Sequence, residues 1–296
     1  MKLSIAIREF LEDCELAKGL APKTITNYQH YLNRLLEFAG DIDVAQLTDK
    51  IVRQWRLNLN SSGKLSLTSQ NYHLVALRAL LAWLVARDIP SLPPKKIDLP
   101  GVEQPDVVFL NQQSIEKLLA APDASTLKGK RDRAILETLF STGLRVSELI
   151  SLNRKQFNDS DELSIKGKGG KRRVVFISSR ARQAVETYLG ARHDTNDALF
   201  VPLRIKEDAD NRLTQRSIQR IISETSRTAG LDDEITPHTL RHTFATDLLQ
   251  AGADLRSVQA LLGHSSVVTT QRYTHLTDTH LKEVHSAFHG RQQSDS

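Results

Sequence analysis

The sequence predicts a mainly helical chain with one small β-hairpin, arranged as an N-terminal helical bundle followed by a C-terminal α+β domain. Five of the nine prolines lie between residues 90 and 105. Since proline fixes φ and lacks an N–H, this stretch is neither helix nor central strand. Before it, apolar residues recur at three- and four-residue steps, as along one face of a helix. After it, residues 162–177 hold β-branched runs on both sides of a glycine-rich turn, which is typical of a hairpin.

These changes of pattern divide the chain into domains. We expect a helical domain over residues 1–89, a proline-rich linker over 90–105, a second domain over 106–290 and a short tail over 291–296. Because a proline-rich segment is extended, each domain should fold around its own core.

The first domain contains two clear helical patterns. One apolar face consists of Ile25, Tyr28, Leu32, Leu35 and Leu36. Gly40 ends that helix, and a second apolar run follows over 72–85. A four-helix bundle is the simplest packing of such segments. Its basic residues Lys64, Arg78 and Arg87 suit either a solvated face or a face that grips a polyanion.

The second domain begins with two helical segments, 131–140 and 145–149, separated by Thr142-Gly143. The predicted hairpin follows, and its tip is strongly basic. The basic residues of the tip are Lys166, Lys168, Lys171, Arg172 and Arg173.

Later helices carry clear start and stop signals. Thr236 is an N-cap residue and Pro237 suits the first helical position, so a helix begins there and ends at Gly252. Asp254 caps the next helix, which Gly263 ends.

Composition excludes several classes of protein. The net charge of +5 and a pI near 9.3 favour a polyanionic partner only weakly. The single Cys14 excludes an internal disulfide framework. No apolar run approaches the ~20 residues that span a bilayer, and the N-terminus enters an acidic stretch instead of a secretory signal. We therefore expect a soluble cytoplasmic protein with no membrane partner.

The most informative residues lie in the last quarter of the chain. His238 and Arg241 are three residues apart on a predicted helix, so their side chains project to the same side. His238 also lies in the first turn, where free backbone amides favour an anion. His264 follows Gly263 directly, and Tyr273 lies in a polar segment. Each residue alone is more often structural than catalytic, but the group together predicts a phosphate site with a nucleophilic phenol.

Several separated motifs carry a resemblance to a known family. They are Thr142-Gly143-Leu144-Arg145-Val146-Ser147-Glu148, Gly167-Lys168-Gly169, His238-Thr239-Leu240-Arg241-His242, Leu262-Gly263-His264-Ser265 and Tyr273-Thr274-His275. In this order and spacing the chain resembles the tyrosine recombinases, and within them the Xer-type site-specific recombinases. The resemblance implies two domains that form a clamp around DNA. It also implies a catalytic set of Arg145, Lys168, His238, Arg241, His264 and the nucleophile Tyr273.

The residue types suit that chemistry. The Arg145 and Arg241 guanidiniums can offset the charge that develops on a phosphate under attack. A phenol with a pKa of about 10 needs help to ionise, and His238 is the candidate base. Lys168 would protonate the departing sugar oxygen, and His264 would hydrogen-bond the phosphate. Glu148 is expected to brace the first helix of the site.

The family implies a 3′-phosphotyrosyl intermediate and a free 5′-hydroxyl. The covalent bond conserves the phosphodiester's energy, so no nucleotide cofactor is expected, and no GxxxxGK[ST] loop is present. A metal site is the main rival for the histidines. Their spacing spreads His275, His280, His285 and His289 around a helix, so we expect no metal.

Two further regions bear on partners. Lys166, Lys171, Arg172 and Arg173 suit a solvated hairpin tip, but because they lie beside Lys168 we expect them to contact DNA phosphates. Leu281, Val284 and Phe288 form an apolar stripe at helical spacing. That stripe either packs on its own domain or, as the family implies, docks into a neighbour and closes a homo- or hetero-tetramer on double-stranded DNA.

The predicted function is therefore site-specific recombination that resolves chromosome or plasmid dimers. The family also implies a second recombinase or a DNA translocase as partners. The first alternative is a mobile-element or phage integrase of the same chemistry. The second alternative is a DNA-binding protein without catalysis, against which the complete set of six residues argues.

Overall fold

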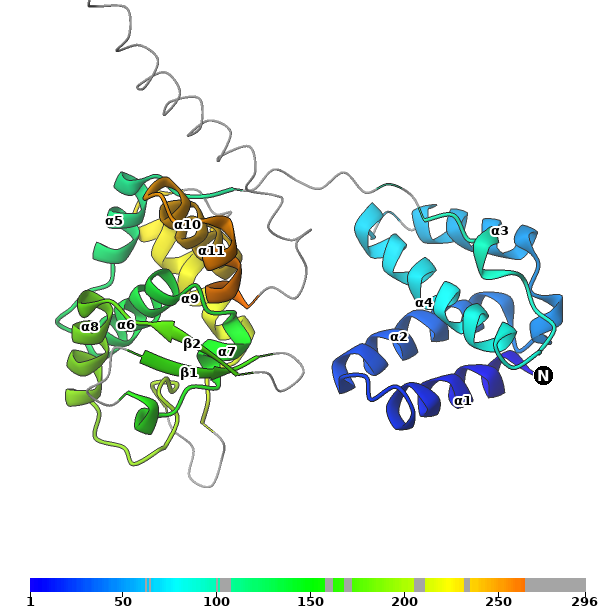
Figure 1. Ribbon diagram of the computed structural model, residues 1–296, viewed down its shortest axis with the longest axis horizontal. Helices are drawn as coiled ribbons and strands as arrows, with labels where there is room; N and C mark the ends of the chain where they lie inside the picture. The colour runs from blue at the N-terminus through cyan, green and yellow to red at the C-terminus, as the bar shows by residue number, and fades with distance from the viewer. Residues whose placement is uncertain are drawn as a thin grey trace, which may run out of the picture. The chain divides into compact units, whose positions relative to one another are not determined.

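The computed structural model describes residues 1–61, 63, 65–99, 101, 108–157, 162–167, 172–204, 211–231 and 235–263. The chain divides into two compact units, Met1–Pro105 and Asp106–Ser296. Figure 1 shows a first unit built of helices and a second in which helices surround a small sheet. The predicted fold class, mainly helical with one small sheet, is confirmed.

Four long helices and two short 3-10 helices make up the described residues of the first unit. They are α1 (Leu3–Leu16), α2 (Pro22–Ala39), η1 (Val44–Gln46), α3 (Asp49–Ser61), α4 (Leu67–Val85) and η2 (Pro94–Lys96). The Ser66 side chain accepts from the Ser69 amide and caps α4. Gly40 ends α2 at φ 74°, a positive value that glycine adopts without a steric penalty. Helix α4 is buried on most of its circumference, with Trp83 packed against Phe10 of α1.

The second unit contains seven α-helices, one 3-10 helix and one two-stranded sheet among the residues described. They are α5 (Gln112–Ala120), α6 (Leu127–Thr142), α7 (Val146–Ile150), η3 (Arg154–Gln156), β1 (Glu162–Lys166), β2 (Arg172–Phe176), α8 (Ser179–Gly190), α9 (Gln215–Thr228), α10 (Pro237–Gln250) and α11 (Leu255–Leu262). The strands are antiparallel, with Ile165 opposite Arg173 and Lys166 opposite Arg172. β2 lies beside both α6 and α11 (Figure 1).

Two glycine turns bring the ends of α6 and α11 into position. Gly143 ends α6 at φ 60°, and a Cβ there would lie 2.4 Å from the Phe244 ring. Only glycine fits both the backbone conformation and the space. Gly263 ends α11 at φ 63°. The predicted helix start at Thr236 is also confirmed, since its side chain accepts from the Thr239 amide at the beginning of α10.

No helix within the described ranges combines the length and the apolarity that a bilayer crossing requires.

Candidate active site

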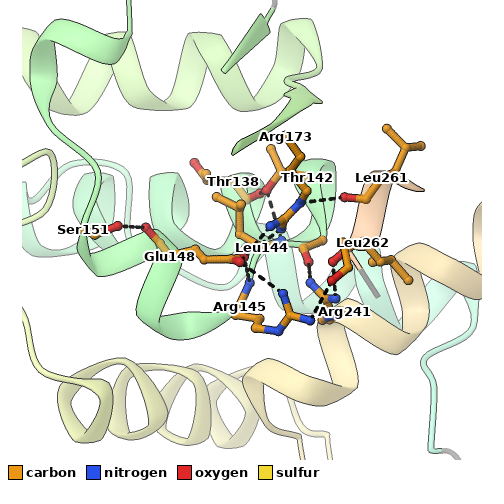
Figure 2. Close-up of polar contacts among 12 residues, drawn as sticks. Thr138, Thr142, Leu144, Arg145, Glu148, Ser151, Arg173, Arg241, Leu261 and Leu262 are labelled. Carbon is orange, nitrogen blue, oxygen red and sulfur yellow. Dashed lines mark hydrogen bonds and ion pairs between the residues drawn. The ribbon is translucent and has the colours of Figure 1, made fainter. Parts of the chain in front are cut away.

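Two arginines from distant parts of the sequence converge on the backbone that ends α11. Arg145 is the N-cap residue of α7, and its Nη2 donates to the Gly263 carbonyl over 3.2 Å. Arg241 lies on α10, and its Nη2 donates to the Leu262 carbonyl over 2.7 Å. The Arg241 Nη1 donates to the carbonyl of Gly143, two residues before Arg145. Figure 2 shows these side chains around the same point. The structure therefore brings together the two arginines that the sequence predicted to act on one phosphate.

The two guanidiniums differ in exposure. Arg241 is buried, with 6% of its surface exposed, whereas the Arg145 side chain is 35% exposed. Carbonyl groups carry no net charge, so their hydrogen bonds orient the guanidiniums without cancelling the positive charge. A guanidinium has five N–H donors, and Arg145 uses two of them in the contacts to Glu148 and Gly263. Donors of Arg145 thus remain for an anion.

Glu148 lies at the centre of the polar cluster. It is 5% exposed and accepts from the Arg145 backbone N–H over 2.8 Å and from the Arg145 Nη1 over 3.1 Å. The Arg173 guanidinium donates to both carboxylate oxygens, over 2.8 and 2.7 Å (Figure 2). Burial alone would raise the pKa of Glu148, but the hydrogen bonds and charges of Arg173 and Arg145 outweigh it and hold the pKa below its usual value. Glu148 is therefore ionised at neutral pH.

His238 lies in the first turn of α10, one turn before Arg241 on the same side. Its residue surface is exposed, yet partial desolvation of the ring lowers the pKa of the imidazole. The positive charges of Arg241 and Arg145 lower that pKa further. The ring is consequently neutral at pH 7 and can accept a proton.

Comparisons with known proteins agree with this geometry. Residues 108–280 match the Phage integrase family, and residues 7–88 match the Phage integrase N-terminal SAM-like domain. The tyrosine recombinase XerD of Oceanobacillus iheyensis is 35% identical, over 98% of this chain and 99% of that protein. The tyrosine recombinase XerC of Pelobacter propionicus is 36% identical, over 97% and 96%. The chain belongs to the tyrosine recombinases. It is a site-specific DNA recombinase.

Two solved structures resemble the chain in fold. The XerH recombinase bound to palindromic difH substrate, a post-cleavage complex, has a TM-score of 0.72 and 25% identity over 96% of this chain and 85% of that one. A lambda integrase dimer bound to a COC′ core site has a TM-score of 0.72 at 18% identity, over 90% and 96%, and shares the fold. The recombinase's enzyme class, DNA strand cleavage and rejoining, is thus confirmed.

Several predicted site residues lie outside the described residues of the recombinase. They are Lys168, Lys171, His264 and Tyr273, together with the C-terminal histidines and the stripe Leu281, Val284 and Phe288. The described residues that adjoin Lys168 and His264 in the sequence show where these two segments leave the described structure. Lys166 and Arg172 are exposed partners at the end of the two strands, on either side of the sequence that holds Lys168. Gly263, directly before His264, already contacts Arg145.

Arg173 lies differently from the exposed basic residues with which the sequence grouped it. Its side chain is 12% exposed, and its contacts are Glu148 and the Leu261 carbonyl. The signal for this position is the alternation of a strand, because Arg173 shares a face of β2 with the buried Val175 while Arg172 and Val174 point outward. A charged side chain on the buried face of a strand requires a partner.

Within the part of the recombinase that the structure describes, no group of three or more histidine, cysteine, aspartate or glutamate side chains could hold a metal ion.

Proposed function

We propose that this recombinase cleaves and rejoins DNA by transesterification through Tyr273, and that it resolves chromosome or plasmid dimers as a Xer-type enzyme in the cytoplasm. The convergence of Arg145 and Arg241 beside His238 is the observation that supports the chemistry most directly. Two fixed cations next to a neutral base are what an attack by phenol on a phosphodiester requires.

Arg145 and Arg241 would bind the non-bridging oxygens of the scissile phosphate. As the fifth oxygen approaches, negative charge grows on those oxygens, and prepositioned donors stabilise it without having to reorganise. Arg241 is held on two carbonyls and Arg145 on Glu148 and a carbonyl, so both side chains are oriented before DNA arrives. Bidentate donation by guanidinium suits a phosphate better than a single ammonium does.

Proton transfers would occur on either side of the phosphate. His238 accepts the Tyr273 phenol proton as the oxygen attacks phosphorus, and the bond from phosphorus to the 5′ sugar oxygen breaks. Lys168 donates a proton to that departing oxygen, and His264 donates a hydrogen bond to the phosphate. The 3′-phosphotyrosyl bond preserves the energy for religation, so the proposed cycle needs no nucleotide cofactor.

The wider role rests on relatives and on charge. Relatives named XerD and XerC match over nearly their whole lengths at 35% and 36% identity, which favours a Xer role over a mobile-element integrase. Lys166, Lys171 and Arg172 would contact DNA phosphates without reading sequence. The C-terminal stripe would dock into a neighbouring protomer and close a homo- or hetero-tetramer on DNA, with a second recombinase or a DNA translocase as further partners.

A nicked-duplex trapping assay tests the proposal. A duplex that the protein selects from sheared genomic DNA is nicked near the protected site, so that cleavage releases a short strand and traps the covalent adduct. Wild-type protein should form an adduct that survives denaturant, and Tyr273→Phe should bind the duplex with a Kd within about threefold but form none. An adduct with Tyr273→Phe would contradict the assignment of the nucleophile, and wild-type binding without any adduct would contradict the chemistry.

A further inference from the structure

Arg173 links three segments of the second unit. Its Nη1 and Nη2 donate to the two oxygens of Glu148 over 2.8 and 2.7 Å, and its Nε donates to the Leu261 carbonyl over 3.0 Å. One side chain on β2 therefore contacts the start of α7 and the last turn of α11. Figure 2 shows the Glu148 carboxylate between the guanidiniums of Arg173 and Arg145.

The packing around Arg173 leaves little freedom. A Cβ at Gly263 would lie 3.0 Å from the Arg173 Cδ and 3.1 Å from its Nη1, so the turn that ends α11 packs directly on this side chain. Both oxygens of Glu148 are engaged by the planar fork of the guanidinium, a geometry that a lysine ammonium cannot reproduce. The arrangement is therefore specific for arginine.

Arg173 also determines how Arg145 is held. Glu148 contacts both arginines, and without Arg173 its buried negative charge would have only Arg145 as a charged partner. A buried carboxylate that has only one cationic partner forms closer contacts with that partner, because a buried charge without full compensation is costly. Arg145 would then turn its exposed donors away from the phosphate and toward Glu148.

Two catalytic segments meet at this contact. Arg173 lies five positions after Lys168 in the sequence, on the strand that follows the hairpin tip. The Leu261 carbonyl that it binds lies three positions before His264. The contact thus connects the segment of the expected general acid, the arginine of α7 and the segment of the expected phosphate-binding histidine.

We propose that Arg173 is a positioning residue for strand cleavage, acting through Glu148 on Arg145 and through Leu261 on the turn before His264, and not a phosphate contact. The inference rests on the proposed function, since it assigns Arg173 a part in the same site. It predicts a loss in the rate of the chemical step with DNA affinity preserved.

The test compares Arg173→Lys with Arg192→Lys. Arg192 is a matched control because it is also bidentate on a carboxylate, with contacts of 2.8 and 2.5 Å to Asp194, and also donates to backbone carbonyls, those of Ala198 and Leu199. Single-turnover adduct formation on the nicked duplex is measured per DNA-binding-competent molecule, so that partial unfolding of either variant does not enter the rate. DNA affinity is measured over a range of salt concentrations.

Arg173→Lys should lower the adduct rate about 10- to 100-fold, the range typical of lost orienting contacts, with the Kd within about threefold. Arg192→Lys should retain the wild-type rate. A phosphate contact would be revealed by Arg173→Gln, which removes the charge, because loss of such a contact raises the Kd and lowers the slope of log K against log salt by about one. That result, or a wild-type rate for Arg173→Lys, would overturn the proposal.

A double variant covers the case in which Arg173→Lys is unstable. Glu148→Gln removes the buried charge that Arg173 neutralises, so in that background Arg173→Lys should change the adduct rate less than about threefold. Additive losses would contradict action through Glu148. If wild-type protein forms no adduct at all, the proposed function fails instead, and the two failures are thereby distinguished.

Discussion

Asp194 and Glu148, both in the second unit, are each held by two arginines, but the arginines differ in how many of their donors remain for a ligand. Asp194 contacts Arg192 and Arg154, and the Arg192 side chain is 1% exposed with its nitrogens committed to Asp194 and to carbonyls. Glu148 contacts Arg173 and Arg145, and the Arg145 side chain is 35% exposed beside His238 and Arg241.

The difference in exposure between Arg192 and Arg145 distinguishes an ion pair that only stabilises the fold from one whose arginine can also bind a ligand. Hydrogen bonds from Arg192 lower the pKa of Asp194 to about 2, so this carboxylate is ionised and stabilised by its arginine partner. At Glu148, Arg173 provides the same bidentate contact and Arg145 is thereby left with donors for a ligand. The two clusters have similar composition, but only in the Glu148 cluster is one arginine, Arg145, partly exposed and able to bind a ligand.

The largest expected effect is on Arg145 itself. Arg145→Gln should lower single-turnover adduct formation by roughly 100- to 1,000-fold, since one of two prepositioned donors to the developing charge is lost. Rapid-quench measurement on the nicked duplex gives the rate. A rate within threefold of wild type would remove the distinction between the two clusters, because Arg145 would then be as structural as Arg192.

The next effect is on stability and belongs to the other cluster. Arg192→Gln breaks a largely buried ion pair and should lower the free energy of unfolding by about 3 kcal/mol. Urea denaturation monitored by circular dichroism measures this loss. The adduct rate of the folded fraction should stay at the wild-type value, and a rate loss beyond tenfold would mean that the Asp194 cluster also supports the site.

A smaller effect is expected on the pH dependence of cleavage, and it tests the comparison between the two clusters. The charged groups that face Glu148 are Arg173 from β2 and Arg145 from the start of α7. Arg173→Gln removes the larger lowering influence, so burial raises the pKa of Glu148 relative to the wild-type enzyme. Ionised Glu148 is the form that holds Arg145, so the activity that remains in Arg173→Gln should be present above the raised pKa and lost as pH falls through it.

The pH profile of single-turnover cleavage between pH 5 and 8 measures this shift. Relative to its own rate at pH 8, Arg173→Gln should lose severalfold more activity than wild type at the acidic end, because a larger fraction of its Glu148 is protonated there. Parallel profiles for the two proteins would show that Glu148 does not respond to Arg173.

Local signals in the sequence were sufficient for much of the fold. Thr236-Pro237 predicted the start of α10, and the glycines at 143 and 263 predicted the ends of helices, because caps and left-handed turns depend on the residue itself. The hairpin followed from β-branched runs around a glycine-rich turn. These features need no knowledge of distant contacts.

The internal role of Arg173 could not be separated from its basic neighbours by charge alone. Five basic residues near one turn look alike in sequence, and only the register of β2 places Arg173 on the buried face. Its partner Glu148 lies 25 positions earlier in the sequence, on another element. Arg241 likewise donates to the carbonyl of Gly143, which lies 98 positions before it. Such pairings depend on packing, which composition and periodicity do not contain.

The most direct test of the account is a structure of Tyr273→Phe protein bound to its duplex site. We predict one backbone phosphate whose non-bridging oxygens are bound by Arg145 and Arg241 together, with the Arg173 guanidinium still on Glu148. A scissile phosphate that touches neither arginine, or one bound by Arg173, would contradict it.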